Sequence, residues 1–310
     1  MRVGFFGTPG LAARCLFELQ RKHEICFAVT SVDTESGRNR KVQFCPAKLE
    51  ALRLNIPVLQ PADLKDPRFY DTIETYHADI FVIVAYGNLI PRPVYELPPL
   101  KTINLHPSLL PRYRGAAPIQ WALINGEKET GITVQLINER LDAGDIIEQE
   151  VIQLDNDTTA ADLYRIVETI GPGLLQRAIE ALSSQRAVPI QQNESMATFC
   201  RKIDREVARI DWKRSSSAIH NLVRGLNPKP VAFSNFRGEG IRIWKTAMID
   251  AELSDRLEPG ALMRYQKKRL IAGTGTGSID IRTIQPANKK IMDGLSFING
   301  YRLAAGDHFE

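Results

Sequence analysis

The stretch Asp79-Ile80-Phe81-Val82-Ile83-Val84-Ala85 decides the fold, because it is the strongest strand signal in the chain. A near-continuous apolar run of this length is typical of a central parallel strand that is covered on both faces. Nearer the start, residues 3–6 and 25–30 predict two more strands, separated by a turn at 7–10 and a helical pattern at 11–19. This β-turn-α-β opening predicts an α/β fold with a Rossmann-like, doubly wound, mainly parallel sheet.

A second stretch carries the polar residues that the sheet would present. It reads Asn104-Leu105-His106-Pro107-Ser108-Leu109-Leu110-Pro111-Arg112-Tyr113-Arg114-Gly115 and follows a short apolar run at 102–103. Asn104 and His106 are two residues apart, so on an extended backbone they point to the same side. The polar pair therefore lies at the carboxyl end of a strand, where open α/β sheets bind their ligands. An Asn and a His in this position are, by themselves, more often structural than catalytic.

The rest of the chain divides into an edge of the sheet, a linker and a second domain. Alternating patterns at 130–137 and 146–154 predict an antiparallel pair, and a helix follows from 157 to about 181, interrupted at 171–173. Several short strand-like runs after residue 206 predict a small, β-rich, OB-like barrel. We therefore expect domains at 1–183 and 206–310, joined by a polar linker at 184–205.

Composition and charge limit the classes of protein that are possible. A chain of 310 residues with 44% hydrophobic and 25% charged residues is typical of a soluble protein of two domains. No apolar stretch is long enough to span a bilayer, and the four cysteines show no CxxC spacing. Residues 201–310 hold 20 Lys/Arg and 12 Asp/Glu, a net charge of +8, whereas residues 1–200 have a net charge of −4. We expect a cytoplasmic monomer without a membrane partner. Its basic C-terminal part could hold a polyanion or be a solvated basic surface, and charge alone does not decide between the two.

Asp142 is a candidate partner for His106. A carboxylate beside an imidazole orients the ring and stabilises its charged form, so the two could carry a proton. Transfer of an acyl group to an amine needs such a proton carrier and a donor to the developing oxyanion, and the Asn104 amide could be that donor. An Asp in the turn Asp142-Ala143-Gly144-Asp145 is, however, more often a turn former, and we interpret Asp145 as structural.

Two other kinds of site are not favoured by the sequence. The glycines at 4, 7 and 10 do not match G-x-G-x-x-G, and Asp33 lies beyond the second strand, so a nicotinamide site is not expected. Neither His nor Cys residues cluster at ligand spacing, so no metal site is expected.

The pattern Asn104-x-His106-x-Ser108-Leu109-Leu110-Pro111-x-x-x-Gly115 closely resembles the formyltransferases that use 10-formyltetrahydrofolate. The resemblance extends over nearly the whole chain, through residues 6–9, 112–120, 208–212 and 285–290, and it favours the branch whose acceptor is the initiator methionyl-tRNA. It implies that Asn104, His106 and Asp142 are the catalytic set. It also implies that the folate site is lined by residues of two loops: Ser108, Leu109, Leu110 and Pro111, and Tyr86, Gly87, Asn88, Leu89 and Ile90.

The implied function is transfer of a formyl group from 10-formyltetrahydrofolate to the α-amine of methionine on the initiator tRNA, for translation initiation. Arg38, Arg40 and Lys41 stand in a long loop that we expect to contact this tRNA; the competing interpretation is a solvated loop. The chain departs from the family in this 31–45 loop, which lacks the usual Pro- and Gly-rich sequence, and at Lys229, where the family usually has Trp. Formyl transfer to an amino-sugar nucleotide, or a non-catalytic RNA-binding module, remain the alternatives.

Overall fold

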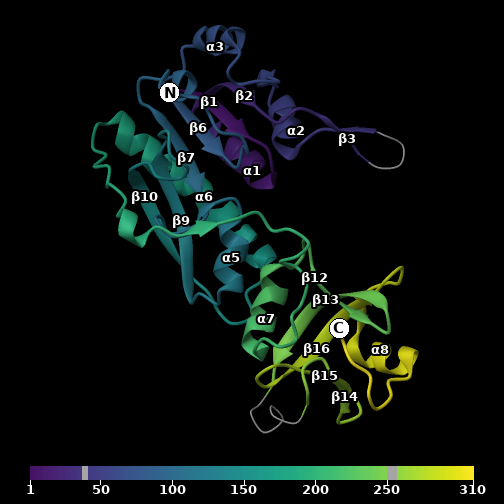
Figure 1. Cartoon of the computed structure of the whole chain (residues 1–310). Coiled ribbons are helices and arrows are strands. Elements are labelled where there is room, and N and C mark those ends of the chain that lie inside the picture. The colour runs from purple at the N-terminus through teal and green to yellow at the C-terminus, as the bar shows by residue number, and fades with distance from the viewer. Residues whose placement is uncertain (37–40, 250–256) are drawn as a thin grey trace. The chain divides into compact units, whose positions relative to one another are not determined.

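The first of two compact units in the computed structural model is built on a seven-stranded sheet (Figure 1). The structure describes residues 1–36, 41–249 and 257–310, and this unit comprises 1–115, 130–152 and 164–199. The strands across the sheet are, in order, β10 (Ile146–Gln153), β9 (Glu129–Leu136), β7 (Thr102–His106), β6 (Ile80–Val84), β1 (Arg2–Gly7), β2 (Glu24–Val29) and β5 (Val58–Leu59). Strands β5, β2, β1, β6 and β7 are parallel to one another, and β9 is antiparallel to β7. The predicted mainly parallel sheet is confirmed.

Strand β6 lies between β1 and β7, and all five of its residues are buried. Its Phe81 packs edge-on against Phe27 and tilted against Phe6, in a cluster that also includes Phe69 and Ile73. The helices of this unit are α1 (Gly10–Leu19), α2 (Pro46–Arg53), α3 (Pro67–Glu74), α4 (Arg92–Tyr95) and most of α6 (Ala160–Ser183). The continuous apolar run therefore makes a strand that is buried on both faces.

Helix α6 runs without a break through Pro172, so the predicted interruption at 171–173 is wrong. Gly171 brings the helix backbone close to the sheet: a Cβ there would lie 3.0 Å from Leu105 Cδ2 and 3.3 Å from Ile132 Cδ1. A methyl group here would require these two side chains to shift by a few tenths of an ångström, so the glycine favours the close approach. It does not end the helix.

Two segments that we predicted to be irregular contain regular structure. The 31–45 loop forms an antiparallel hairpin of β3 (Thr34–Ser36) and β4 (Lys41–Gln43). The segment predicted as a linker contains a 3₁₀ turn, η1 (Glu194–Met196), and β11 (Phe199–Cys200), and Ile190 exchanges two backbone hydrogen bonds with Ile146. Residues 184–199 thus belong to the first compact unit.

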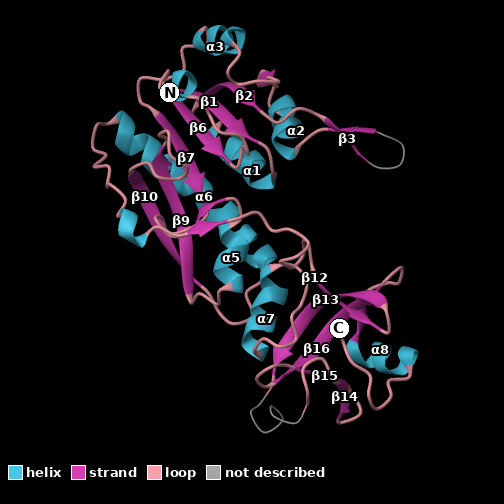
Figure 2. Cartoon of the chain, viewed as in Figure 1, coloured by secondary structure: helices cyan, strands magenta, loops and turns pink. Residues whose placement is uncertain are grey.

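The second unit comprises residues 116–129, 153–163 and 200–310, so two segments that we expected in the first domain belong to it. Its antiparallel sheet has the order β12 (Ala232–Phe236), β13 (Glu239–Met248), β16 (Ser278–Pro286), β15 (Arg269–Gly273) and β14 (Leu262–Tyr265), with β17 (Met292–Asp293) beside β16. Its helices are α5 (Pro118–Ile124), α7 (Ser216–Gly225) and α8 (Gly294–Tyr301). Figure 2 shows strands dominating the C-terminal part, as predicted.

The last residues of the chain join the two edge strands of this sheet. Phe309 bridges Phe236 at the end of β12, and His308 bridges Ala261 immediately before β14. The Phe309 ring stacks on Trp212 at 5.1 Å between centroids, inside the buried cluster of the unit. These contacts give the sheet its barrel-like closure.

Candidate active site

Strand β7 places Asn104 and His106 on one face of the sheet, at the carboxyl end of the strand. Leu105, between them, points to the opposite face, where it lies against Gly171. His106 is buried and Asn104 is half-buried. In the register with β9, Asn104 is opposite Gln135. The alternation of the strand thus produces the predicted polar pair.

Both ring nitrogens of His106 face oxygen atoms of the protein. Nε2 lies 2.9 Å from the carbonyl oxygen of Tyr113, which can only accept, so this hydrogen bond requires a proton on Nε2. Nδ1 lies 3.6 Å from Oδ2 of Asp142. The structure therefore brings His106 and Asp142 together, as predicted.

The carboxylate of Asp142 is held by donors from two directions. The backbone N–H of Gly115 donates to Oδ2 at 2.8 Å, and the side-chain amide of Gln135 donates to Oδ1 at 3.2 Å. Asp142 itself has φ = 50°, in the left-handed region that Asp tolerates better than most residues. At Gly144 a Cβ would overlap the carbonyl oxygen of Leu136, so this tight turn requires glycine. The Asp142 turn is therefore both structural and part of the site.

Arg114 and Gln192, which contact the Asp142 turn directly or through one another, were not predicted from the sequence. The guanidinium of Arg114 is buried and hydrogen-bonds Gln192 and Glu194. The Gln192 amide in turn lies within hydrogen-bond distance of Gln135 and of the backbone oxygen of Asp142. The only signal in the sequence was the alternation of β9, which puts the polar Gln135 on the same face as Thr133.

The loop after β7 contains two buried residues, Ser108 and Leu110, and two half-buried residues, Leu109 and Pro111. Ser108 is fully buried, and its hydroxyl donates to the backbone oxygen of Arg112 at 2.7 Å. Leu110 is also buried. Leu109 and Pro111 are half-buried, and Leu109 packs so closely on Gly131 that a Cβ there would overlap it.

In the loop after β6, the first and last residues pack against the core and the three between them are exposed. Tyr86 packs against Phe6 with ring centroids 5.8 Å apart, and burial raises the pKa of its phenol. Ile90 packs against the same cluster. The three residues between them (Gly87, Asn88 and Leu89) are exposed, and the Leu89 side chain is 77% exposed. An exposed leucine beside the carboxyl ends of β6 and β7 is available to an apolar ligand.

The remaining predicted contacts concern the tRNA. Arg38 and Arg40 lie outside the described residues, and Lys41 is the first residue of β4. Lys229 is exposed in the segment before β12.

Within the described parts of the chain, no group of three His, Cys, Asp or Glu side chains is placed to hold a metal ion. No helix in those same ranges is long and apolar enough to cross a membrane.

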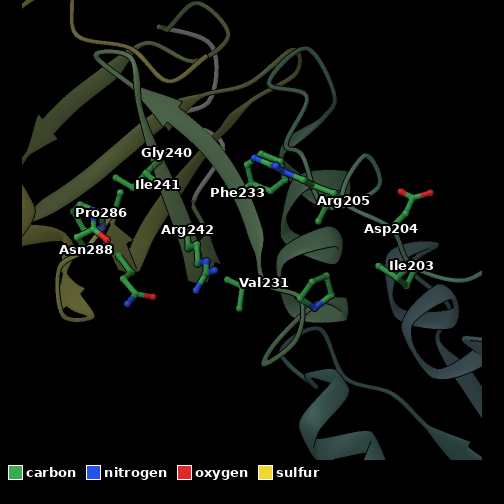
Figure 3. A pocket seen from close by; sticks show the side chains of 14 residues that line it. Ile203, Asp204, Arg205, Val231, Phe233, Gly240, Ile241, Arg242, Pro286 and Asn288 are labelled. Atoms are coloured by element: carbon green, nitrogen blue, oxygen red, sulfur yellow. The ribbon is translucent and has the colours of Figure 1, made fainter. Parts of the chain in front are cut away.

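A groove of about 620 Å³ opens on the second unit (Figure 3). Val231 and Ile241 contribute apolar, buried surface to it, and Arg205 and Arg242 are exposed beside them. The Arg205 guanidinium lies over the ring of Phe233, 5.5 Å from its centroid. The exposed carboxylate of Asp204 also lines the groove, so its rim carries both signs of charge. The two guanidinium groups beside an apolar surface suit a nucleotide, which combines a flat base with a phosphate.

Comparison with known proteins identifies the family. The family model described as Formyl transferase matches residues 1–179, and the model described as Formyl transferase, C-terminal domain matches residues 202–302. A curated methionyl-tRNA formyltransferase of Acetivibrio thermocellus is 36% identical over 308 residues, which is 99% of both chains. One of Fusobacterium nucleatum is 38% identical over the same share of both chains.

Solved structures share the fold at lower identity. HypX from Aquifex aeolicus in complex with tetrahydrofolic acid matches with a TM-score of 0.66 and 18% identity, covering 98% of this chain and 48% of that one. The sugar 3N-formyl transferase WlaRD matches with a TM-score of 0.67 and 19% identity, covering 94% of this chain and 99% of that one. A methionyl-tRNA formyltransferase from Clostridium thermocellum matches with a TM-score of 0.57 and 18% identity, covering 81% and 95%. The two family models and the full-length relatives together show that this chain belongs to the methionyl-tRNA formyltransferase family.

Proposed function

We propose that this enzyme transfers the formyl group of 10-formyltetrahydrofolate to the α-amino group of methionine on the initiator tRNA. The observation that carries the proposal is similarity over 99% of the chain to relatives that are named for this activity. The placement of Asn104, His106 and Asp142 supports it, because formyl transfer needs an oxyanion donor and a proton carrier at one point.

The reaction joins the amine nitrogen to the formyl carbon. The nitrogen lone pair attacks that carbon, and the π electrons of the carbonyl bond move to its oxygen. The half-buried amide of Asn104 can donate a hydrogen bond to this oxygen. When the tetrahedral intermediate collapses, the bond from carbon to N10 of the folate breaks. N10 then gains a proton, and the amine nitrogen loses one.

His106 and Asp142 supply the route for this proton. Because Nε2 carries the proton that is bonded to the Tyr113 carbonyl, Nδ1 is the ring atom that can take the proton from the amine nitrogen. The Asp142 carboxylate, 3.6 Å from Nδ1, stabilises the positive charge that results. The donors Gly115 and Gln135 hold the Asp142 carboxylate in place beside the ring. The imidazolium then donates this proton to the departing N10.

The folate donor would bind between the two loops that end β6 and β7. Gly87, Asn88 and Leu89 are exposed on one loop, and Leu109 and Pro111 are half-buried on the other. Leu89 and Leu109 are the apolar side chains available to the flat pterin ring. Ser108, Leu110, Tyr86 and Ile90 would hold the loops in place and would not contact the ligand.

The tRNA would be held by basic residues of both units. In the first unit these are Arg38, Arg40 and Lys41, which belong to the β3–β4 segment. In the second unit they are Arg205 and Arg242 beside the groove. The net charge of +8 over residues 201–310 supports this assignment.

The deciding experiment follows release of tetrahydrofolate with two acceptors. Charged initiator tRNA should support release, and an amino-sugar nucleotide should not. Turnover with the sugar nucleotide alone would replace this proposal with that acceptor. No turnover with either, together with RNA binding, would favour a non-catalytic module.

A further inference from the structure

We propose that Gln192 is a positioning residue for the reaction and acts through Asp142, with Arg114 fixing its orientation. The inference rests on the proposed function. Gln192 comes from the segment that the sequence presents as a linker, 50 residues after the aspartate that it contacts. It does not reach the reacting atoms.

Gln192 is 5% exposed, and its side-chain amide connects two parts of the Asp142 turn. Its Nε2 atom lies 2.9 Å from the backbone oxygen of Asp142 and 2.7 Å from that of Gly144. It also lies 3.0 Å from Oε1 of Gln135, whose own amide nitrogen donates to the Asp142 carboxylate. One amide group thus contacts the backbone of the turn and the residue that orients the carboxylate.

Arg114 determines which way this amide faces. Its Nε and one terminal nitrogen donate to Oε1 of Gln192 at 3.1 and 2.8 Å, which leaves Nε2 to face the carbonyl oxygens. The two terminal nitrogens also pair with the carboxylate of Glu194 at 2.9 and 3.1 Å. A buried guanidinium needs such partners, since an unpaired charge inside a protein is costly. The flipped amide would put an N–H group against the arginine and is therefore excluded.

This arrangement controls the distance that matters for proton transfer. Asp142 is held at φ = 50°, a conformation that persists only where surrounding contacts maintain it. The contacts of the Gln192 amide with the backbone oxygens of Asp142 and Gly144 are among these. If the turn relaxes, Oδ2 leaves its place 3.6 Å from His106 Nδ1. A misplacement of about 1 Å between reacting groups can reduce turnover by about a hundredfold.

The test is a double-mutant cycle on turnover. Gln192→Met keeps the length of the side chain and removes both polar atoms. We expect kcat to fall about tenfold or more, with KM for tRNA and for the folate donor within about twofold of wild type. In the Asp142→Asn background the same substitution should change kcat by less than about twofold, because the residue through which it acts is already impaired. Multiplicative losses in the double mutant would overturn the inference, and so would an unchanged kcat in the single mutant.

Two controls separate this role from general destabilisation. Arg140→Ala removes an exposed ion pair to Glu194 and leaves the contacts of Gln192 intact, so kcat should not change. If circular dichroism shows that Gln192→Met is unfolded at the assay temperature, Gln135→Met takes its place in the same cycle, since it removes the 3.2 Å bond to Oδ1. If the wild-type protein formylates no tRNA, the proposed function is contradicted. If the wild type is active and the losses of kcat in the double mutant are multiplicative, only the positioning role is contradicted.

Discussion

The Nδ1 atom of His106 lies 3.6 Å from Oδ2 of Asp142, and the two side chains are 6% and 11% exposed. This separation is slightly too long for a hydrogen bond. Each residue is nevertheless held from its other side, His106 by the carbonyl of Tyr113 and Asp142 by the N–H of Gly115. The pair is therefore pre-organised, and only a small approach is needed to share a proton.

The first prediction concerns this pair. His106→Ala removes the proton carrier, so kcat should fall at least about a hundredfold while the protein stays folded. Asp142→Asn should also be impaired, because both of its oxygens accept from donors and an amide nitrogen in either place would face an N–H group. Steady-state kinetics with circular dichroism as the folding check decide the matter. Near-normal turnover in both variants would remove these residues from the mechanism.

The sequence predicted the parts of the fold that depend on local pattern. The apolar run at 80–84 is a fully buried strand, and the two-residue spacing of Asn104 and His106 puts both on one face. The interruption expected at Gly171-Pro172-Gly173 was wrong, since the helix continues through all three residues. The prediction considered only the backbone hydrogen bond that proline lacks and could not include the packing of Gly171 on Leu105.

The site was predictable only in part. Asp142 was identified through the family resemblance, since an aspartate in a turn is usually structural. Arg114 and Gln192 are 78 residues apart in the chain, and no local pattern relates two residues at that distance. Their contact depends on the path of residues 184–199. The polar composition of this segment led us to predict a linker there.

The second prediction tests the turn that carries Asp142. Gly144→Ala places a methyl group on the carbonyl oxygen of Leu136, so the free energy of unfolding should fall by about 2 kcal/mol or more. Gly173→Ala is the matched control, because its Cβ would meet nothing closer than a flexible Arg177 nitrogen at 3.9 Å. That helical substitution should be neutral or stabilising by up to about 1 kcal/mol. Equal denaturation midpoints for the two variants would contradict the strain argument.

The third prediction concerns the basic residues of the β3–β4 segment. Replacing Arg38, Arg40 and Lys41 together by Ala should raise KM for tRNA and leave binding of the folate donor unchanged, because phosphate contacts hold only the nucleic acid. Lys22 and Lys65 are exposed bases of the same unit, and their double substitution by Ala is the control. If the triple variant keeps the wild-type KM for tRNA, the segment is a solvated loop.

The fourth prediction concerns the groove of the second unit. Binding of tRNA should weaken steeply with salt, whereas binding of the small folate donor should not. Replacing Arg205 and Arg242 by Ala should lower the slope of log Kd against log salt by about 1 for each phosphate that the variant no longer neutralises. Lys268→Ala, an exposed base outside the groove lining, should change the slope less. Equal slopes for the groove variant and wild type would place the tRNA elsewhere.

The fifth prediction concerns closure of the C-terminal sheet in acid. Arg237 donates two hydrogen bonds to Asp307, at 2.8 and 2.7 Å, and this pairing lowers the pKa of the Asp307 carboxyl. Asp307 immediately precedes His308 and Phe309, which bridge the two edges of the sheet.

Because the folded pKa is below the unfolded value of about 3.9, the unfolded chain binds the proton more readily. The stabilisation is therefore present above about pH 4 and is lost as the pH falls through the folded pKa. Asp307→Asn should lower Tm by roughly 2 °C or more at pH 7, and the difference from wild type should shrink below about pH 4. Thermal melts of both proteins from pH 7 to pH 3 measure this. A Tm difference that stays constant down to pH 3 would mean that the asparagine disturbs packing and that the ion pair does not hold the closure.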